Sequence, residues 1–131
     1  MFPRNVTILS TERFIEGGKS SASFENFNLA LHVNDRPENV LANRSILRNH
    51  YDLPSEPVWV NQTHSSICIN ASLNGSLVEA DASFTSKPGV VCGILTADCL
   101  PVFISKKDGA MVGIAHAGWK GLVLGVIEGL I

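Results

Sequence analysis

Residues 96–121 constrain the fold of this chain more than any other stretch. They contain two apolar runs, at 101–105 and 110–115, on either side of a turn that includes Asp108 and Gly109. An Asp-Gly pair between two such runs is typical of a β-hairpin, because it supplies the positive φ angles of a tight turn. We therefore expect two antiparallel strands here, followed by an apolar helix that begins in the Gly-rich segment after the second strand.

A thiol and an imidazole flank this predicted hairpin. Cys99 precedes the first strand, and His116 follows the second. Antiparallel pairing brings these two ends together at one edge of the sheet. Both side chains bind a borderline-soft metal, and both take part in covalent catalysis. The pattern therefore predicts a functional site at this edge.

His64 is a third candidate ligand, at the end of a strand predicted over residues 58–62. Two imidazoles and one thiolate form a three-ligand set, and catalytic zinc sites keep their fourth position for water or substrate. A single histidine is more often a surface or core residue, so the hypothesis depends on convergence. Asp98 and Asp81 are candidates for proton transfer. Asp98 could instead orient a histidine or serve only as a turn carboxylate.

Two further segments offer positive charge for an anionic substrate. Gly118 and Lys120 lie in G-W-K-G, where the N-terminus of the predicted helix suits a phosphate or carboxylate. The glycines could equally serve close packing alone. Arg44 lies on or beside the apolar face of a second helix, predicted from Asp35 as N-cap to about His50. It is either an arginine that extends to solvent or a contact for an anionic group.

Short strands are expected at residues 5–10, 28–33 and 90–95. The chain of 131 residues is long enough for one domain, predicted over 1–131. Its net charge of −2 and the lack of a basic run give no indication of nucleic-acid binding. No apolar stretch is long enough to indicate a membrane span.

Three cysteines without a C-x-x-C pair indicate a reducing compartment and a cytoplasmic location. Cys68 and Cys92 are expected to be structural, and Cys92 to be buried. The last residues, V-L-G-V-I-E-G-L-I, form an apolar helix-like segment without a polar face. We expect this chain to be the N-terminal portion of a longer protein, truncated at its C-terminus. Burial of the segment inside the chain or in a homo-oligomer is the alternative.

Four motifs, in the order W-V-N-Q-T-H, E-A-D-A, T-A-D-C-L-P and A-H-A-G-W-K-G, resemble the laccase-domain or YfiH-like family. Its members were once described as polyphenol oxidases and are now described as multifunctional purine nucleoside phosphorylases. The resemblance covers most of the chain from about Asn28 onward. It implies an α/β (α+β) fold, with a mixed sheet and flanking helices, and a zinc ion held by His64, Cys99 and His116. It also implies phosphorolysis of adenosine, inosine and methylthioadenosine, and deamination of adenosine.

The chain departs from the family pattern in the early T-E-R-F-I-E-G-G stretch and at three further positions. Thr63 and Ser65 stand where the family usually has valine and glycine, and Lys120 stands where it has arginine. Members of the family are also about twice as long. We therefore expect the 131-residue chain alone to have weak or no phosphorylase activity, although it contains all three expected ligands.

The leading hypothesis is a zinc-dependent purine nucleoside phosphorylase with adenosine deaminase activity. Its expected catalytic residues are Cys99, His64 and Asp98, and its expected phosphate contacts are Arg44, Lys120 and Gly118. The first alternative is a hydrolase or amidase with Cys99 as nucleophile. A non-catalytic zinc-binding fragment and a copper-dependent polyphenol oxidase are the others.

Overall fold

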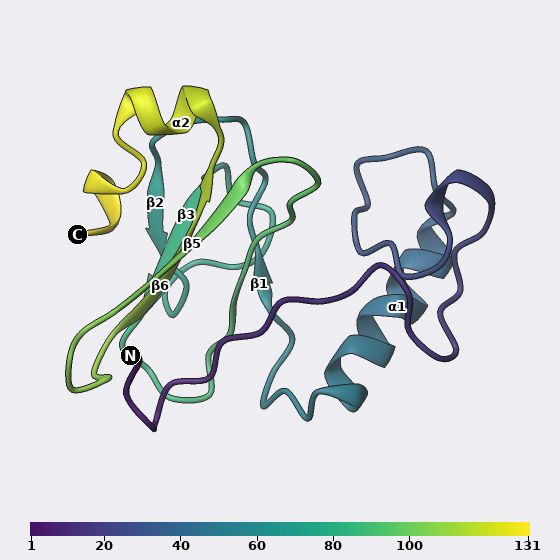
Figure 1. The fold of residues 1–131 in the computed structure, drawn as a ribbon, viewed down its shortest axis with the longest axis horizontal. Helices are drawn as coiled ribbons and strands as arrows, with labels where there is room; N and C mark the ends of the chain where they lie inside the picture. Colours follow the sequence, from purple (N-terminus) through teal and green to yellow (C-terminus); the bar gives the residue numbers. More distant parts are fainter. The chain divides into compact units, whose positions relative to one another are not determined.

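The computed structural model describes residues 1–131, which form two compact units. One unit comprises residues 1–8 and 55–131, and the other comprises residues 9–54. Figure 1 shows helix α1 in the second unit and strands β1, β2, β3, β5 and β6 in the first.

The second unit contains the short 3-10 helix η1 (Ala22–Phe24) and α1 (Pro37–His50). The extent of α1 confirms the predicted helix, with Pro37 in its first turn, where the missing N–H leaves no bond unmade. The N-cap is Arg36, one residue after the expected Asp35. Asp35 instead accepts hydrogen bonds from the backbone of Arg36 and from Ser20 Oγ and Asn28 Nδ2.

Two predicted strands are wrong. Residues 28–33 form turns and irregular backbone. There, the Asn28 side chain accepts from Ala30 N and donates to Ala30 O, and such local bonds compete with a sheet ladder. Residues 5–10 are also irregular, and the N–H of Val6 closes a turn onto Pro3 O.

A four-stranded sheet, in the order β2-β3-β6-β5, forms the body of the first unit. It consists of β2 (Cys68–Asn70), β3 (Ala82–Thr85), β5 (Leu100–Ser105) and β6 (Val112–Ala117). Strands β2 and β3 are parallel, whereas β6 is antiparallel to both of its neighbours. The sheet is therefore mixed, which confirms the predicted α/β (α+β) class.

The β5–β6 pair confirms the predicted hairpin. Its register pairs Leu100 with Ala117 at one end and Ser105 with Val112 at the other. Gly109 has φ +73° in the connecting loop, a conformation that glycine adopts without steric cost. His116 lies inside β6 rather than after it, because the strand runs two residues further than expected.

A smaller parallel pair joins β1 (Val58–Trp59) to β4 (Cys92–Gly93). Both strands are shorter than the predicted ranges of 58–62 and 90–95. Their parallel pairing directs the segments that follow them toward the same edge. These segments lead to His64 and to Cys99.

The C-terminal segment is not one helix. Helix α2 (Trp119–Leu124) ends at Gly125, whose φ of +85° is left-handed, and the 3-10 helix η2 (Glu128–Leu130) follows. This break turns Val126 and Leu130 into the core, where they pack with Ala82, Ala115 and Ala117. Val123 and Leu124 remain exposed. None of the helices combines the length and apolar character that crossing a membrane requires.

Candidate metal centre

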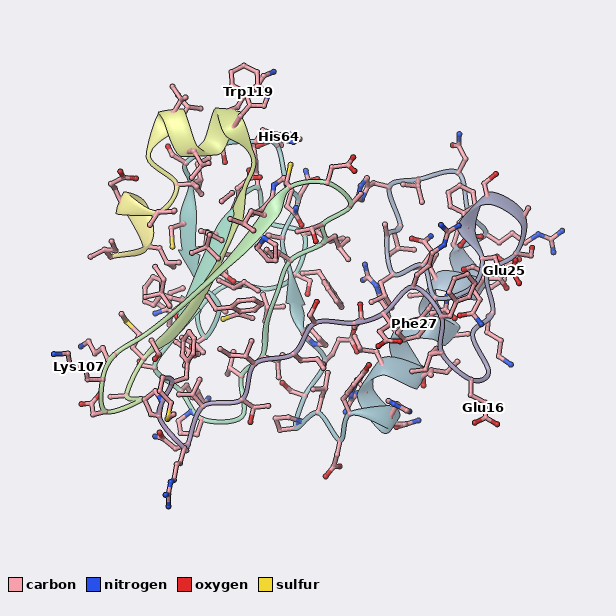
Figure 2. The ribbon with its side chains drawn as sticks, viewed as in Figure 1. Glu16, Glu25, Phe27, His64, Lys107 and Trp119 are labelled. Atoms are coloured by element: carbon pink, nitrogen blue, oxygen red, sulfur yellow. The ribbon has the colours of Figure 1, made fainter.

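The structure brings His64, Cys99 and His116 together. One ligand atom from each side chain lies within 4.8 Å of the others. Cys99 immediately precedes β5, so the hairpin register sets it beside the end of β6, which carries His116. His64 reaches the same place from the loop after β1. His64 and Trp119 lie at one end of the four-stranded sheet, opposite the hairpin turn that carries Lys107 (Figure 2).

The donor set fits a metal ion of intermediate softness. Two imidazoles and one thiol suit zinc or copper, with bond lengths of about 2.0–2.3 Å to zinc. The His64 and His116 rings meet at an angle of 64°, with their centroids 5.0 Å apart. Their burial is graded, since His64 is exposed, Cys99 is half-buried and His116 is buried. The cluster is therefore accessible from the side of His64, as a site that admits a substrate must be.

Asp81 lies behind the cluster, with no exposed surface. Its Oδ2 is 2.8 Å from Nδ1 of His116. Its two oxygens also accept hydrogen bonds from the backbone N–H groups of residues 63, 64 and 65 and from the hydroxyl of Ser65. Burial acting alone would raise the pKa of Asp81, but these hydrogen bonds, that from His116 first among them, lower the pKa below its ordinary value. Asp81 is therefore an ionised acceptor at neutral pH.

Gln62 joins the loop of His64 to the segment that leads to Cys99. Its Nε2 donates to Leu95 O at 2.7 Å, and its Oε1 accepts from Leu95 N at the same distance. One amide side chain thus replaces a pair of backbone ladder bonds just beyond the short β1–β4 pair. This clamp fixes the spacing of two ligand-bearing segments that are far apart in the sequence.

Lys120 lies in the first turn of α2, and its Nζ is 5.6 Å from the ring centroid of Trp119. Both side chains are exposed, and Trp119 retains 74% of its accessible surface. Gly118 is the buried N-cap of this helix. The end of the sheet that carries the cluster therefore also presents a cation and an aromatic ring to solvent.

The other expected site residues differ in their surroundings. Asp98 is exposed, and its carboxylate has none of the hydrogen bonds that hold Asp81. Arg44 belongs to the unit of residues 9–54, where it is buried and its Nε and Nη2 donate to Leu29 O at 3.0 and 2.8 Å. Its expected role in phosphate binding stays a prediction.

Sequence reasoning missed the parts played by Asp81 and Gln62. It gave Asp81 a role in proton transfer, whereas the carboxylate here organises a loop and a histidine. One signal was present, because a carboxylate between alanines in E-A-D-A is costly to bury unless it is paired. No sequence signal identified the partner of Gln62, since that partner is the backbone of Leu95.

Residues 7–131 match the family described as multi-copper polyphenol oxidoreductase laccase. Among curated proteins, the chain is 43% identical over 126 residues to the purine nucleoside phosphorylase of Haemophilus influenzae. It is 41% identical over 129 residues to the purine nucleoside phosphorylase YfiH of Escherichia coli. Each match covers 96% of this chain and 51% of the relative. The chain thus spans about half the length of these relatives.

Two solved structures resemble the fold of this chain, and each match again covers about half of the solved chain. Protein NMB0706 of Neisseria meningitidis superimposes with a TM-score of 0.78 at 42% identity, over 86% of this chain and 46% of that one. The hypothetical protein YfiH of Bacillus licheniformis superimposes with a TM-score of 0.80 at 29% identity, over 88% and 47% of the two chains.

Proposed function

The chain belongs to the family described as multi-copper polyphenol oxidoreductase laccase, and we propose that it acts as a purine nucleoside phosphorylase with zinc held at His64, Cys99 and His116. The observation that carries the proposal is the name of the relatives, which match 96% of the chain at above 40% identity. The proposed substrates are adenosine, inosine and methylthioadenosine with phosphate, and deamination of adenosine is a proposed second activity. Three free cysteines fit a cytoplasmic location.

The donor chemistry supports the metal. His116 is fixed by Asp81 through Nδ1, which leaves Nε2 for a ligand bond, as in metal sites whose histidines are held by a carboxylate. Three protein ligands leave one coordination position open. When bound, zinc would supply a Lewis acid at that position.

The chain's own residues would position the reactants. In phosphorolysis, a phosphate oxygen bonds to C1′ of the ribose, the bond from C1′ to the base breaks, and the base takes the electron pair and a proton. Lys120 and Gly118 are the proposed phosphate contacts in this unit, and the role of Arg44 in phosphate binding remains a separate prediction. Asp98, exposed beside Cys99, is the proposed proton carrier for this step and for the loss of ammonia in deamination.

The assay that tests the proposal incubates zinc-loaded protein with inosine, with and without phosphate. The expected products are hypoxanthine and ribose 1-phosphate, formed only when phosphate is present. Adenosine in the same assay separates the two activities, because phosphorolysis releases adenine and deamination releases inosine.

His64→Ala should reduce product formation to the level without protein, because it removes a ligand and an expected catalytic residue. His32→Ala is the matched control, since His32 is an exposed histidine of the other unit. Measurable turnover that is equal in the His64→Ala variant and the wild type would contradict the proposed role of the cluster in this activity. An inactive chain that retains zinc would instead favour the non-catalytic alternative.

One observation favours a second candidate function. Cys99, His116 and Asp81 occur in the order of a nucleophile, a base and a carboxylate that orients the base, as in cysteine hydrolases. Chelation separates the two functions. A hydrolase that uses Cys99 keeps its activity without metal and loses it on alkylation, whereas the proposed zinc enzyme loses activity on chelation.

The copper alternative rests on the name of the family. A single thiolate with two imidazoles can bind copper, but multi-copper oxidation requires several copper sites. The chain holds a single cluster of three or more such ligands. Zinc therefore remains the proposed metal, and the metal content of the purified protein decides between them.

A further inference from the structure

We propose that Asp81 is a positioning residue that fixes the two histidines of the cluster at once, His64 through its backbone and His116 through its ring. The inference rests on the proposed metal site for its consequence, although the positioning itself can be measured without metal. Asp81 is suited to this task because its backbone N–H and its backbone C=O are both hydrogen-bonded. Its N–H donates to Ile67 O at 3.0 Å, and its C=O accepts from His116 N at 2.7 Å.

The loop of His64 depends on the carboxylate. The N–H groups of Thr63, His64 and Ser65 donate to Asp81 at 3.0, 3.1 and 2.7 Å. Three successive amides point at a single side chain only when the backbone curls around it. His64 has φ +59°, a left-handed conformation that non-glycine residues rarely adopt. The bonds to Asp81 therefore hold His64 in a conformation that it would not keep on its own.

The tautomer of the His116 ring depends on the same carboxylate, through its Oδ2. Both oxygens of Asp81 already accept hydrogen bonds from backbone N–H groups, so Asp81 is also the acceptor in the contact of 2.8 Å and the hydrogen lies on Nδ1 of His116. The unprotonated nitrogen is then Nε2, the atom left for a ligand bond. An asparagine at position 81 would offer one oxygen for these donors, and its NH2 group would favour the opposite tautomer of His116.

Ser65 contributes a second bond to the same carboxylate. Its hydroxyl lies 2.9 Å from Oδ1 of Asp81, in addition to the bond from its own N–H. The Ser65→Ala variant therefore removes one of the bonds that Asp81 accepts, whereas a change of Asp81 affects all of them.

The experiment compares Asp81→Asn and Ser65→Ala with the wild type by two measurements. The first is the tautomer of His116 in metal-free, 15N-labelled protein, from two-bond nitrogen–hydrogen correlations. The second is the zinc dissociation constant, from competition with a chromophoric chelator. Asp52→Asn is the matched control, because it makes the same aspartate-to-asparagine change at an exposed position of the other unit.

The expected wild-type tautomer carries its hydrogen on Nδ1. Asp81→Asn should shift the signal toward the form protonated on Nε2 and weaken zinc binding by about 10- to 100-fold. Ser65→Ala should retain the tautomer and weaken zinc binding by less, and Asp52→Asn should match the wild type. A variant that merely loosened the fold would lower its melting temperature without changing the tautomer.

Two outcomes would overturn the proposal. The first is a wild-type protein in which His116 is protonated on Nε2, and this measurement does not depend on the folding of any variant. The second is a folded Asp81→Asn variant that keeps the wild-type tautomer. Failure of the metal proposal is distinguishable. A wild-type chain that binds no zinc contradicts the metal site, whereas the tautomer of the metal-free protein still confirms or refutes the role of Asp81.

Discussion

Gly118 lies against Cys99 so closely that a β-carbon at position 118 would stand 2.9 Å from the Cys99 Sγ. The same β-carbon would be 3.3 Å from Cδ2 of His64. The chain thus passes from β6 to α2 directly beside two members of the cluster. A glycine is required here for space, because its φ of −71° is open to any residue.

Gly118→Ala should therefore weaken zinc binding. Pushing Cys99 or His64 off its rotamer costs about 0.5–1.5 kcal/mol, which corresponds to roughly a 2- to 10-fold loss of affinity. Gly75→Ala is the control, because a β-carbon at Gly75 meets no atom within 4 Å. Competition with a chelator measures both variants. Equal zinc affinity of Gly118→Ala and the wild type would show that the geometry around Gly118 does not govern the cluster.

The three cysteines should differ in their reactivity. Burial raises the pKa of Cys68, with the nearby Cys92 adding to the effect. Burial also raises the pKa of Cys92, although a hydrogen bond with Ser83 opposes it. Both thiols are half-buried, so the expected full burial of Cys92 is wrong. Their low thiolate content at neutral pH should make their alkylation slow.

Zinc should protect Cys99 and leave the rates of Cys68 and Cys92 unchanged. Mass spectrometry of peptides after brief alkylation, with and without zinc, gives the labelling at each position. Equal labelling of Cys99 under the two conditions would count against its role as a ligand.

Leu130 and Leu124 offer a matched test of the C-terminal core. Leu130 is 4% exposed and packs in the core cluster, whereas Leu124 is 60% exposed. Leu130→Ala should lower the free energy of unfolding by about 2 kcal/mol or more. Leu124→Ala should change it by less than about 0.5 kcal/mol. Urea unfolding measures both changes. Similar losses in the two variants would show that Leu130 does not contribute to the core as described.

Asp35 should contribute to stability in a pH-dependent way. Burial tends to raise the pKa of Asp35, but hydrogen bonds from Asn28, Ser20 and Arg36 outweigh it and lower the pKa below its ordinary value. A depressed carboxyl pKa stabilises the fold above the unfolded-state pKa, and this contribution is lost as the pH falls through the folded-state pKa. The bonds of Asp35 therefore act at neutral pH and disappear in acid.

Asp35→Asn should lower stability by about 1 kcal/mol at pH 7, since solvent screens this half-exposed group. The difference from the wild type should shrink as the pH falls below about 4. Thermal melts of both proteins across this range measure the difference, with the exposed Glu16→Gln as control. A difference that stays constant with pH would show that the charge of Asp35 contributes nothing.

Local signals explain why the hairpin and α1 were predictable. The turn at Asp108 and Gly109 and the start of α1 at Pro37 follow from the backbone conformations that these residue types favour. The identity of the residues is therefore enough to predict them. The hairpin in turn placed Cys99 beside His116. The convergence of His64 was a hypothesis from residue type, and the resemblance to a known family supported the same three residues.

Non-local contacts explain what could not be predicted. The place of the His64 loop depends on Asp81, and that of the segment before Cys99 depends on Gln62, in each case through bonds to backbone groups. Backbone donors and acceptors occur at every position, so the sequence does not mark which of them a side chain will meet. The same reasoning applies to residues 28–33, whose apolar alternation resembled a strand that lacks a partner here.

The central claim is that one metal ion binds at His64, Cys99 and His116. Elemental analysis of the purified protein, together with a zinc titration, tests it most directly. The expected result is one zinc ion per chain in the wild type and in the His32→Ala control. Near-complete loss is expected in each of His64→Ala, Cys99→Ser and His116→Ala. Full zinc content in a folded Cys99→Ser, or none in the wild type after titration, would contradict the account.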